Sequence, residues 1–153
     1  MLRSDQYVVF TLDEQRYALY LPAVTRVVRT IEIMRLPKVP EIILGVVNMQ
    51  GQVVPVVDIR RRFRLPEREQ ELSDQLIIAK TARRSVALVV DAIEGFIEHP
   101  GQEVIPPEKI LSGTEYIEGV IKLEDGLILI HDLDKFLSLE EDKELDAALK
   151  KKR

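Results

Sequence analysis

The sequence predicts an all-β fold of about ten short strands followed by one C-terminal helix. Short runs of Val, Ile, Leu and Tyr alternate with turn residues, at a spacing typical of sandwiches and barrels. The tail differs in character. Ser138 and Glu141 have the spacing of a capping box, acidic residues follow, and residues 150–153 are all basic. This order complements a helix dipole and favours a helix over residues 140–153.

Length and composition exclude several classes of protein. A chain of 153 residues forms one domain, or two very small barrels that share one interior. It contains no cysteine, which rules out disulfides, thiolate metal sites and cysteine nucleophiles and permits a reducing compartment. No apolar stretch approaches the ~20 residues of a membrane helix, and the N-terminus lacks the core of a signal peptide. We therefore expect a soluble, cytoplasmic protein.

Charge is unevenly distributed along the chain. Residues 1–64 carry ten Lys and Arg against six Asp and Glu, whereas residues 65–153 carry twelve against twenty. The two parts thus have net charges of +4 and −8, which suits a protein with different faces for different partners, although random surface variation accounts for it equally well. Aromatic residues make up only 5% and there is no Trp, so stacking of nucleic-acid bases is disfavoured.

The expected strands follow from apolar runs bounded by turn residues. Residues 24–29 are left open, as either a strand or a helical turn, and Pro22 ends the strand before them. The stretch 66–74 is charged and predicts a loop. The strands are expected at residues 7–12, 16–21, 43–48, 53–58, 76–79, 85–91, 93–98, 116–123 and 127–130.

Residues 42–59 predict a hairpin whose turn contains Gly51, because a tight turn requires a positive φ. Both strands are apolar at almost every position, so both faces of each should be buried. Pro55 indicates a bulge or an edge position. Gly45 indicates either a sharp bend or close approach of another backbone segment.

Two further features concern the C-terminal part of the chain. Asp125 and Gly126 predict a type I′ turn in the last hairpin. In the C-terminal helix, Leu145 and Leu149 should form the inner face. Asp132 should cap a short helical turn that runs through Phe136.

The pattern of residues 45–63 resembles the CheW-like family. The resemblance is carried by G-V-x-N-x-x-G-x-x-x-P-x-x-D-x-R-x-x-F, which begins at Gly45 and ends at Phe63. Further matches lie in family order over about residues 6–139. They are residues 7–10, Tyr17, residues 89–91, 116–119 and 127–130.

This resemblance implies two intertwined, five-stranded SH3-like barrels packed around a shared interior, with residues 1–139 as the CheW-like domain and 140–153 as a charged helix or tail. It implies no catalysis and no cofactor. Family members bind the regulatory domain of the CheA histidine kinase through the ends of the barrels. They also bind the cytoplasmic tips of methyl-accepting chemoreceptors in a groove between the barrels. The protein would then be recruited to membrane-associated receptor arrays without inserting into the membrane.

The residues expected to contact a receptor or kinase lie in three segments. An exposed apolar strip with polar borders could accept a receptor helix, and residues 24–29 supply Val, Thr and Arg in that pattern. Those residues are equally compatible with a buried strand. The predicted contact residues are Val24, Arg26, Val27, Gly45, Asn48, Met49, Gln50, Gly51 and Arg60.

Two positions depart from the family pattern. Family members usually have an arginine at the position of Gln50 and commonly an acidic residue at that of Arg26. The first change removes a fixed charge from the hairpin tip and the second reverses a charge nearby. Either the two changes are drift at solvated positions, or they are matched to a particular receptor or kinase.

Other functional interpretations rest on fewer residues. Residues 60–64 form either an interaction patch or, as we favour, arginine stems that cover Phe63 at a barrel rim. His131 and the two aspartates that follow are weak metal ligands, so no metal site is expected. No serine lies in a nucleophile elbow and no glycine pair has phosphate-loop spacing. The alternative to an adaptor is a small-ligand or nucleotide-binding β-barrel, which requires convergent polar groups in an enclosed pocket.

Overall fold

The computed structural model describes residues 4–100, 103–107 and 116–150. Within these ranges the chain is predominantly β, as predicted, and residues 24–29 form a strand. The ten strands are β1 (Ser4–Leu12), β2 (Gln15–Tyr20), β3 (Val24–Arg29), β4 (Ile43–Met49), β5 (Gln52–Val57), β6 (Gln75–Lys80), β7 (Ser85–Val90), β8 (Ala92–Pro100), β9 (Ile117–Leu123) and β10 (Gly126–His131). The two α-helices are α1 (Ile59–Arg62) and α2 (Leu139–Lys150).

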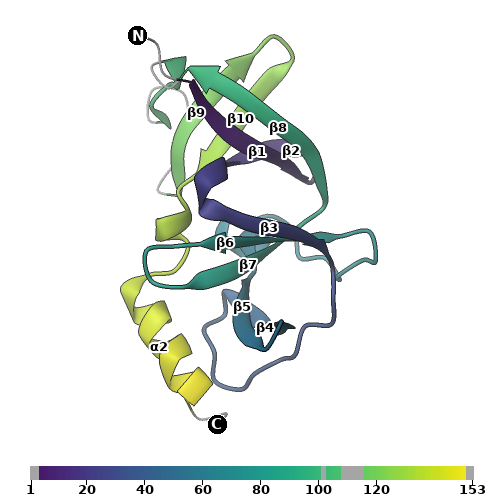
Figure 1. Ribbon diagram of the computed structural model, residues 1–153, viewed down its shortest axis with the longest axis vertical. Coiled ribbons are helices and arrows are strands. Elements are labelled where there is room, and N and C mark those ends of the chain that lie inside the picture. The colour runs from purple at the N-terminus through teal and green to yellow at the C-terminus, as the bar shows by residue number, and fades with distance from the viewer. Residues whose placement is uncertain (1–3, 101–102, 108–115, 151–153) are drawn as a thin grey trace.

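The strands form two five-stranded sheets, which lie one above the other in Figure 1. One sheet has the order β8-β1-β2-β10-β9 and the other β3-β6-β7-β5-β4. Most neighbouring strands are antiparallel, but β2 pairs in parallel with β10 and β5 pairs in parallel with β7. The chain enters the first sheet with β1 and β2, builds the whole second sheet, and then returns to the first. This exchange explains why the two units share an interior.

That shared interior is one large apolar cluster between the sheets. It receives side chains from β1, β2, β6 and β7 and from the segment that leads into α2. Each sheet also curls around a smaller cluster of its own. The largest fully buried members of the shared cluster are Phe10, Leu12, Leu19, Ile59, Ile77, Leu88, Phe136 and Leu145. Burial of apolar surface on this scale is the main stabilising term for the fold.

The hairpin turns follow local backbone chemistry, with one departure from prediction. Gln50 and Gly51 have φ values of +54° and +84°, which is the backbone of a type I′ turn. In the last hairpin Gly126 pairs with Leu123, so the turn residues are Glu124 and Asp125. Neither of them is among the described residues with a positive φ. The predicted type I′ turn at residues 125–126 is therefore wrong, because Gly126 already belongs to the strand.

Strands β4 and β5 are buried on both faces for only part of their length. Val54, Val56 and Val57 are almost fully buried, but Val53 is 53% exposed beside the turn. Pro55 lies opposite Val46 without a bulge. The parallel partner β7 pairs only with Val56 and Val57. Pro55 thus occupies an edge-like position where its missing N–H costs no ladder bond.

Gly45 is required by close approach of the chain's own backbone. The segment at Met34 forms a two-way backbone bridge with Val46, with both N···O distances 2.8 Å. A Cβ added at Gly45 would overlap the Met34 carbonyl oxygen and come within 2.8 Å of Ile33 Cγ2. The close approach anticipated from the sequence is thus made by residues 33–34 of the same chain.

The C-terminal helix has the predicted capping box. Ser138 Oγ accepts a hydrogen bond from the Glu141 N–H at 3.1 Å, and Glu141 Oε1 accepts one from the Ser138 N–H at 2.8 Å. Leu145 is fully buried in the shared core, and Leu149 packs against it. Arg84 Nε reaches back to Asp142 Oδ1 at 2.7 Å, which ties α2 to the β6–β7 hairpin.

The turn before this helix is only partly as predicted. Asp132 does precede a 3₁₀ turn over residues 133–135, but its side chain makes no capping hydrogen bond. Its carboxylate instead lies 3.6 Å from Lys135 Nζ.

Candidate partner-binding surface

Strand β3 presents a partly apolar strip at the edge of its sheet. Val24 and Val27 are half-buried and pack against the shared core. Arg26 and Arg29 are exposed, and within the described part of the chain neither makes an ion pair. A half-buried apolar strip with unpaired cationic borders is compatible with docking of an amphipathic segment.

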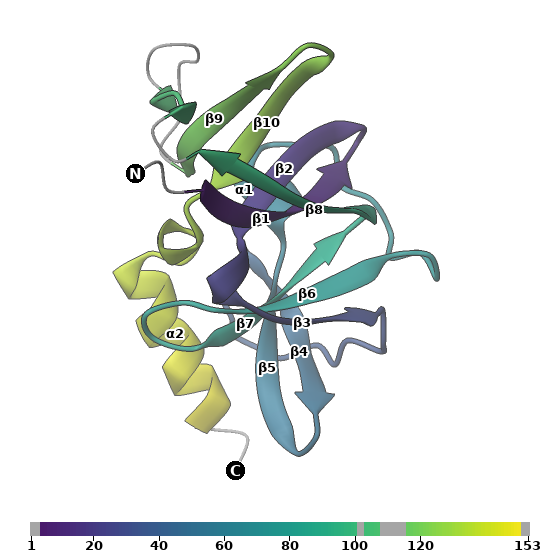
Figure 2. The ribbon, with the colours of Figure 1, turned by 45° about the horizontal axis from the view of Figure 1, so that its top comes forward.

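A second apolar side chain was not found from the sequence. Phe96 is 66% exposed on β8, the edge strand of the other sheet. It lies between Glu94 and Glu98, which are also exposed. In Figures 1 and 2, β8 and β3 lie on the two sides of the junction between the sheets. Residues two apart in a strand share a face, so the acidic residues on both sides of Phe96 were the sequence signal that this face is exposed. The sequence alone does not reveal that no other described element packs on it.

The tip of the β4–β5 hairpin forms the second exposed feature, which points away from the β8-β1-β2-β10-β9 sheet in Figure 2. Asn48 Oδ1 accepts a hydrogen bond from the Gly51 N–H at 2.9 Å, so the asparagine side chain fixes the turn. Gln50 is exposed at the tip, and Met49 is half-buried against the cluster inside this sheet. The structure therefore brings Asn48, Met49, Gln50 and Gly51 together as a rigid, exposed loop.

Two exposed apolar residues extend the area around this hairpin. Val53 is 53% exposed and lies directly opposite Asn48 in the ladder. Met34 is 56% exposed and bridges to Val46 on the outer edge of β4. Gly45 lies beneath Met34 and is buried, so the structure separates it from the exposed tip.

Arg60 is held inside the molecule instead of at an exposed surface. Its side chain is 10% exposed, and Nη2 lies 2.7 Å from Asp13 Oδ1 and 2.8 Å from Asp91 Oδ1. Arg68 binds the same Asp91 carboxylate at 2.5 Å. Burial alone would raise the pKa of Asp91, but hydrogen bonds from Arg60, from the Asp13 N–H and from Arg68 outweigh it and leave that pKa below its ordinary value. Arg60 thus links β1, α1 and the end of β7.

His131 lies in the shared core, where its imidazole ring packs against several aromatic rings. Its ring centroid lies 4.4 Å from that of Phe63, 4.7 Å from that of Tyr17 and 4.8 Å from that of Phe136. The side chain is fully buried, and neither ring nitrogen has a hydrogen-bond partner among the described residues. Burial lowers the pKa of His131 well below its ordinary value, so the imidazole is neutral at pH 7.

Groups that could support other functions are sparse. Within the residues that the structure describes, no three His, Asp or Glu side chains are grouped so that they could hold a metal ion. None of the described helices combines the length and apolar character that crossing a membrane demands.

Comparison with known proteins agrees with this architecture. The family model described as the CheW-like domain matches residues 6–141. The chain is 30% identical over 139 residues to the chemotaxis protein CheW of Bacillus subtilis, covering 90% of this chain and 89% of that one. It is 26% identical over 140 residues to the chemotaxis protein CheW of Klebsiella aerogenes, with 90% and 84% coverage.

A solved structure extends the comparison to three dimensions. The scaffolding protein TtCheW from Thermoanaerobacter tengcongensis superposes with a TM-score of 0.83 at 29% identity, covering 91% of this chain and 96% of that one. The family match spans both sheets and the motif of residues 45–63. The chain therefore belongs to the CheW-like domain family.

Proposed function

We propose that this protein is a non-catalytic chemotaxis adaptor that couples the cytoplasmic tips of chemoreceptors to the regulatory domain of a CheA-type histidine kinase. The observation that carries the proposal is the presence of two separate exposed surfaces on one continuous core. The receptor surface consists of the β3 strip (Val24, Arg26, Val27 and Arg29) and Phe96. The kinase surface consists of the β4–β5 tip (Asn48 to Gly51) with Val53 and Met34.

The receptor surface has the features that a helical partner requires. Helix-in-groove recognition uses apolar anchors, here Val27 and Phe96, with polar residues at the rim. The cationic rim residues Arg26 and Arg29 attract an acidic helix and set its orientation more than its affinity. Because β3 and β8 belong to different sheets, this surface depends on the packing between them.

The kinase surface is contained within one sheet and is small. Val53 and Met34 supply exposed apolar area, and the Asn48-fixed turn supplies a rigid edge. Rigid loops lose little conformational freedom on binding, which favours association. Gln50 replaces the arginine usual in the family at this tip, so the matched-change hypothesis for Gln50 and Arg26 stays a prediction. Comparing the Gln50→Arg, Arg26→Glu double variant with the native chain on two kinases tests it.

The proposal is tested by separating the two surfaces with single substitutions. Phe96→Ser should weaken binding to a receptor-tip fragment by roughly 10-fold or more, as truncation of a central aromatic anchor does, and leave binding to the kinase regulatory domain unchanged. Val53→Ser should do the reverse. Leu72→Ser, at a position that is 96% exposed in the loop before β6, is the matched control and should affect neither partner.

Isothermal titration calorimetry with each purified partner measures both affinities. The two-surface proposal is wrong if Phe96→Ser and Val53→Ser weaken binding of the same partner equally. It is also wrong if neither substitution weakens binding of either partner. The association itself is tested first, since the native chain must bind both partners at once.

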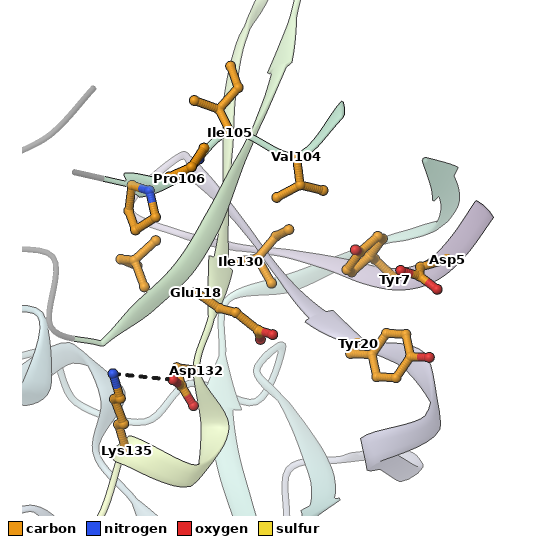
Figure 3. Close-up of a pocket in the computed structure, with 12 residues that line it drawn as sticks. Asp5, Tyr7, Tyr20, Val104, Ile105, Pro106, Glu118, Ile130, Asp132 and Lys135 are labelled. Atoms are coloured by element: carbon orange, nitrogen blue, oxygen red, sulfur yellow. Dashed lines mark ion pairs between the residues drawn. The ribbon is translucent and has the colours of Figure 1, made fainter. Parts of the chain in front are cut away.

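The nucleotide-binding alternative gains no support from two hollows of the described structure. Four arginines line one of them, but an equal number of carboxylates balances their charge, and three of the arginines already form ion pairs. The hollow beside β9 is lined by Asp5, Glu118 and Asp132 (Figure 3). Carboxylates repel phosphate groups, and within the described lining only Lys135 carries positive charge.

A further inference from the structure

Strands β3 and β8 border the same apolar core, although they belong to different sheets. Side chains directly opposite each other in an antiparallel ladder share a face. Phe96 lies opposite Val8, two residues from Phe10, so it is on the face of its sheet that covers the shared core. Val27 lies opposite Ile77, another member of that core. Both apolar anchors of the proposed receptor surface therefore face the junction between the sheets.

At one end of this surface the two strands come together. Gln75 of β6 is the ladder partner of Arg29, the last residue of β3. The Gln75 Oε1 atom accepts a hydrogen bond from the Ile93 N–H, near the start of β8, at 3.0 Å. A single side chain thus connects the end of β3 to the beginning of β8.

At the opposite end, β1 connects the two borders. Tyr7 pairs with Ile97 of β8 on one side and with Tyr20 on the other. Tyr20 is followed by a 3₁₀ turn, Leu21–Ala23, which leads directly into β3. The receptor surface therefore has two distinct ends, one at Gln75 and one at Tyr20, and β3 and β8 run in opposite directions between them (Figure 2).

The two borders carry opposite charges. On β3, Arg29 is exposed and shares a face with Val27, two residues before it. On β8, Glu94 and Glu98 are exposed on either side of Phe96. Arg29 and Glu94 make no ion pair in the described part of the chain, and Glu98 accepts a hydrogen bond from an uncharged amide side chain of β1. An apolar strip thus lies between a cationic border and an acidic one.

We infer, on the basis of the proposed receptor surface, that these opposite borders fix the direction in which a partner helix lies along it. The occupant is an amphipathic helix whose apolar stripe separates an acidic flank from a basic flank. Its acidic flank lies along β3 beside Arg29, and its basic flank lies along β8 beside Glu94 and Glu98. Turning the helix end for end, with the apolar stripe still on the surface, exchanges the two flanks. The reversed helix then brings like charges together, which selects one direction over the other.

Two other occupants suit the observed charges less well. A second copy that paired through β8 around Phe96 would place Glu94 opposite Glu98 of the other strand, and like charges directly opposite each other destabilise a ladder. A uniformly acidic helix would be attracted by β3 but repelled by β8.

The test uses the full chain and designed helical peptides of about 20 residues, each with a leucine stripe and a nitroxide spin label at its N-terminus. The first peptide has glutamates on one flank and lysines on the other, and the second has these flanks exchanged. Broadening of amide NMR signals by the label shows whether the labelled end lies at Gln75 or at Tyr20. The two peptides should bind with affinities within about twofold of each other, but with their labelled ends at opposite ends of the surface. A third peptide, with glutamates on both flanks, should bind at least about fivefold more weakly.

A charge-inverted variant of the chain should reverse the direction of both mixed-charge peptides. This variant combines three substitutions at the two borders, Arg29→Glu, Glu94→Lys and Glu98→Lys. The matched control makes the same three kinds of change at exposed positions elsewhere, Arg83→Glu, Glu124→Lys and Glu144→Lys. The control should leave both directions unchanged, since its net charge is the same but the borders are intact.

The inference is overturned if the labelled end is the same for both mixed-charge peptides, or if each peptide broadens both ends equally. Equal binding of the uniformly acidic peptide, absence of binding by all three, or dilution-dependent shifts on β8 that reveal a second copy would also overturn it. The exchanged peptides act on the native chain, so the test does not depend on folding of the variants. Loss of receptor binding in Phe96→Ser decides the receptor surface separately, so the proposed function can stand when this inference fails.

Discussion

The buried imidazole of His131 makes the stability of this protein depend on pH in a narrow and testable window. The ring is enclosed by Phe10, Tyr17, Phe63 and Phe136, with centroid distances between 4.4 and 5.3 Å. None of these groups can accept a proton or stabilise a cation by forming an ion pair. Protonation of the folded state is therefore strongly unfavourable, and the pKa of His131 lies well below 6.5.

The sign and size of the effect follow from linkage. Above pH 6.5 the imidazole is neutral in both the folded and the unfolded chain, and the free energy of unfolding does not depend on this group. As pH falls below 6.5, only the unfolded chain takes up the proton, so the unfolded state is favoured. The free energy of unfolding should then fall by about 1.4 kcal/mol for each pH unit, until the pKa of the folded state is reached.

Urea unfolding between pH 7.5 and 5.5 measures this slope and stays above the range where most carboxylates titrate. His131→Phe retains an aromatic ring and removes the titrating group, so the slope attributed to this residue should vanish, whatever the change in stability at pH 7.5. A slope that persists in His131→Phe, or that is absent from the native chain, would refute the assignment of a neutral, unpaired imidazole.

Three further predictions concern stability and use the same unfolding assay at pH 7.5. Asp91→Asn should cost roughly 2 kcal/mol, since it leaves two partly buried arginines without their shared carboxylate, and Asp91→Glu should recover part of that loss. Gly45→Ala should lower the free energy of unfolding by about 1–3 kcal/mol, because the added Cβ overlaps the Met34 carbonyl oxygen. An unchanged unfolding midpoint would mean that residues 33–34 move aside without cost. Ser138→Ala should cost about 1 kcal/mol through loss of the helix cap, whereas Ser138→Asp should be nearly neutral.

Most of the fold could be predicted from the sequence because its signals are local. Short apolar runs bounded by turn residues predict strands such as β1 and β6, and a capping box predicts the start of α2. The type I′ backbone at Gln50 and Gly51 likewise depends on a residue that tolerates positive φ. The turn after Leu123 was misassigned because strand register, which tertiary packing sets, decides whether a glycine belongs to the turn or to the strand.

The residues of the proposed surfaces were harder to predict, since exposure is a property of the assembled fold. Gly45 and Arg60 belong to the same sequence motif as Asn48, yet the structure buries both, one under Met34 and the other between two carboxylates. Phe96 was overlooked for the opposite reason. Its strand has no neighbour on its outer side in the sheet order, which no local pattern reveals.

Destabilising the shared core should affect the two proposed surfaces differently. The receptor surface spans β3 and β8, which belong to different sheets, so its geometry depends on the junction that Phe10, His131 and Phe136 fill. The kinase surface lies within one sheet and is supported by the separate cluster of Val47, Val54 and Val56. Loosening the junction should therefore weaken receptor binding before kinase binding. The base of the β4–β5 hairpin joins the shared core through Ile43 and Val57, but the residues nearer its tip pack in the separate cluster, so strain between the sheets should reach the kinase surface less than the receptor surface.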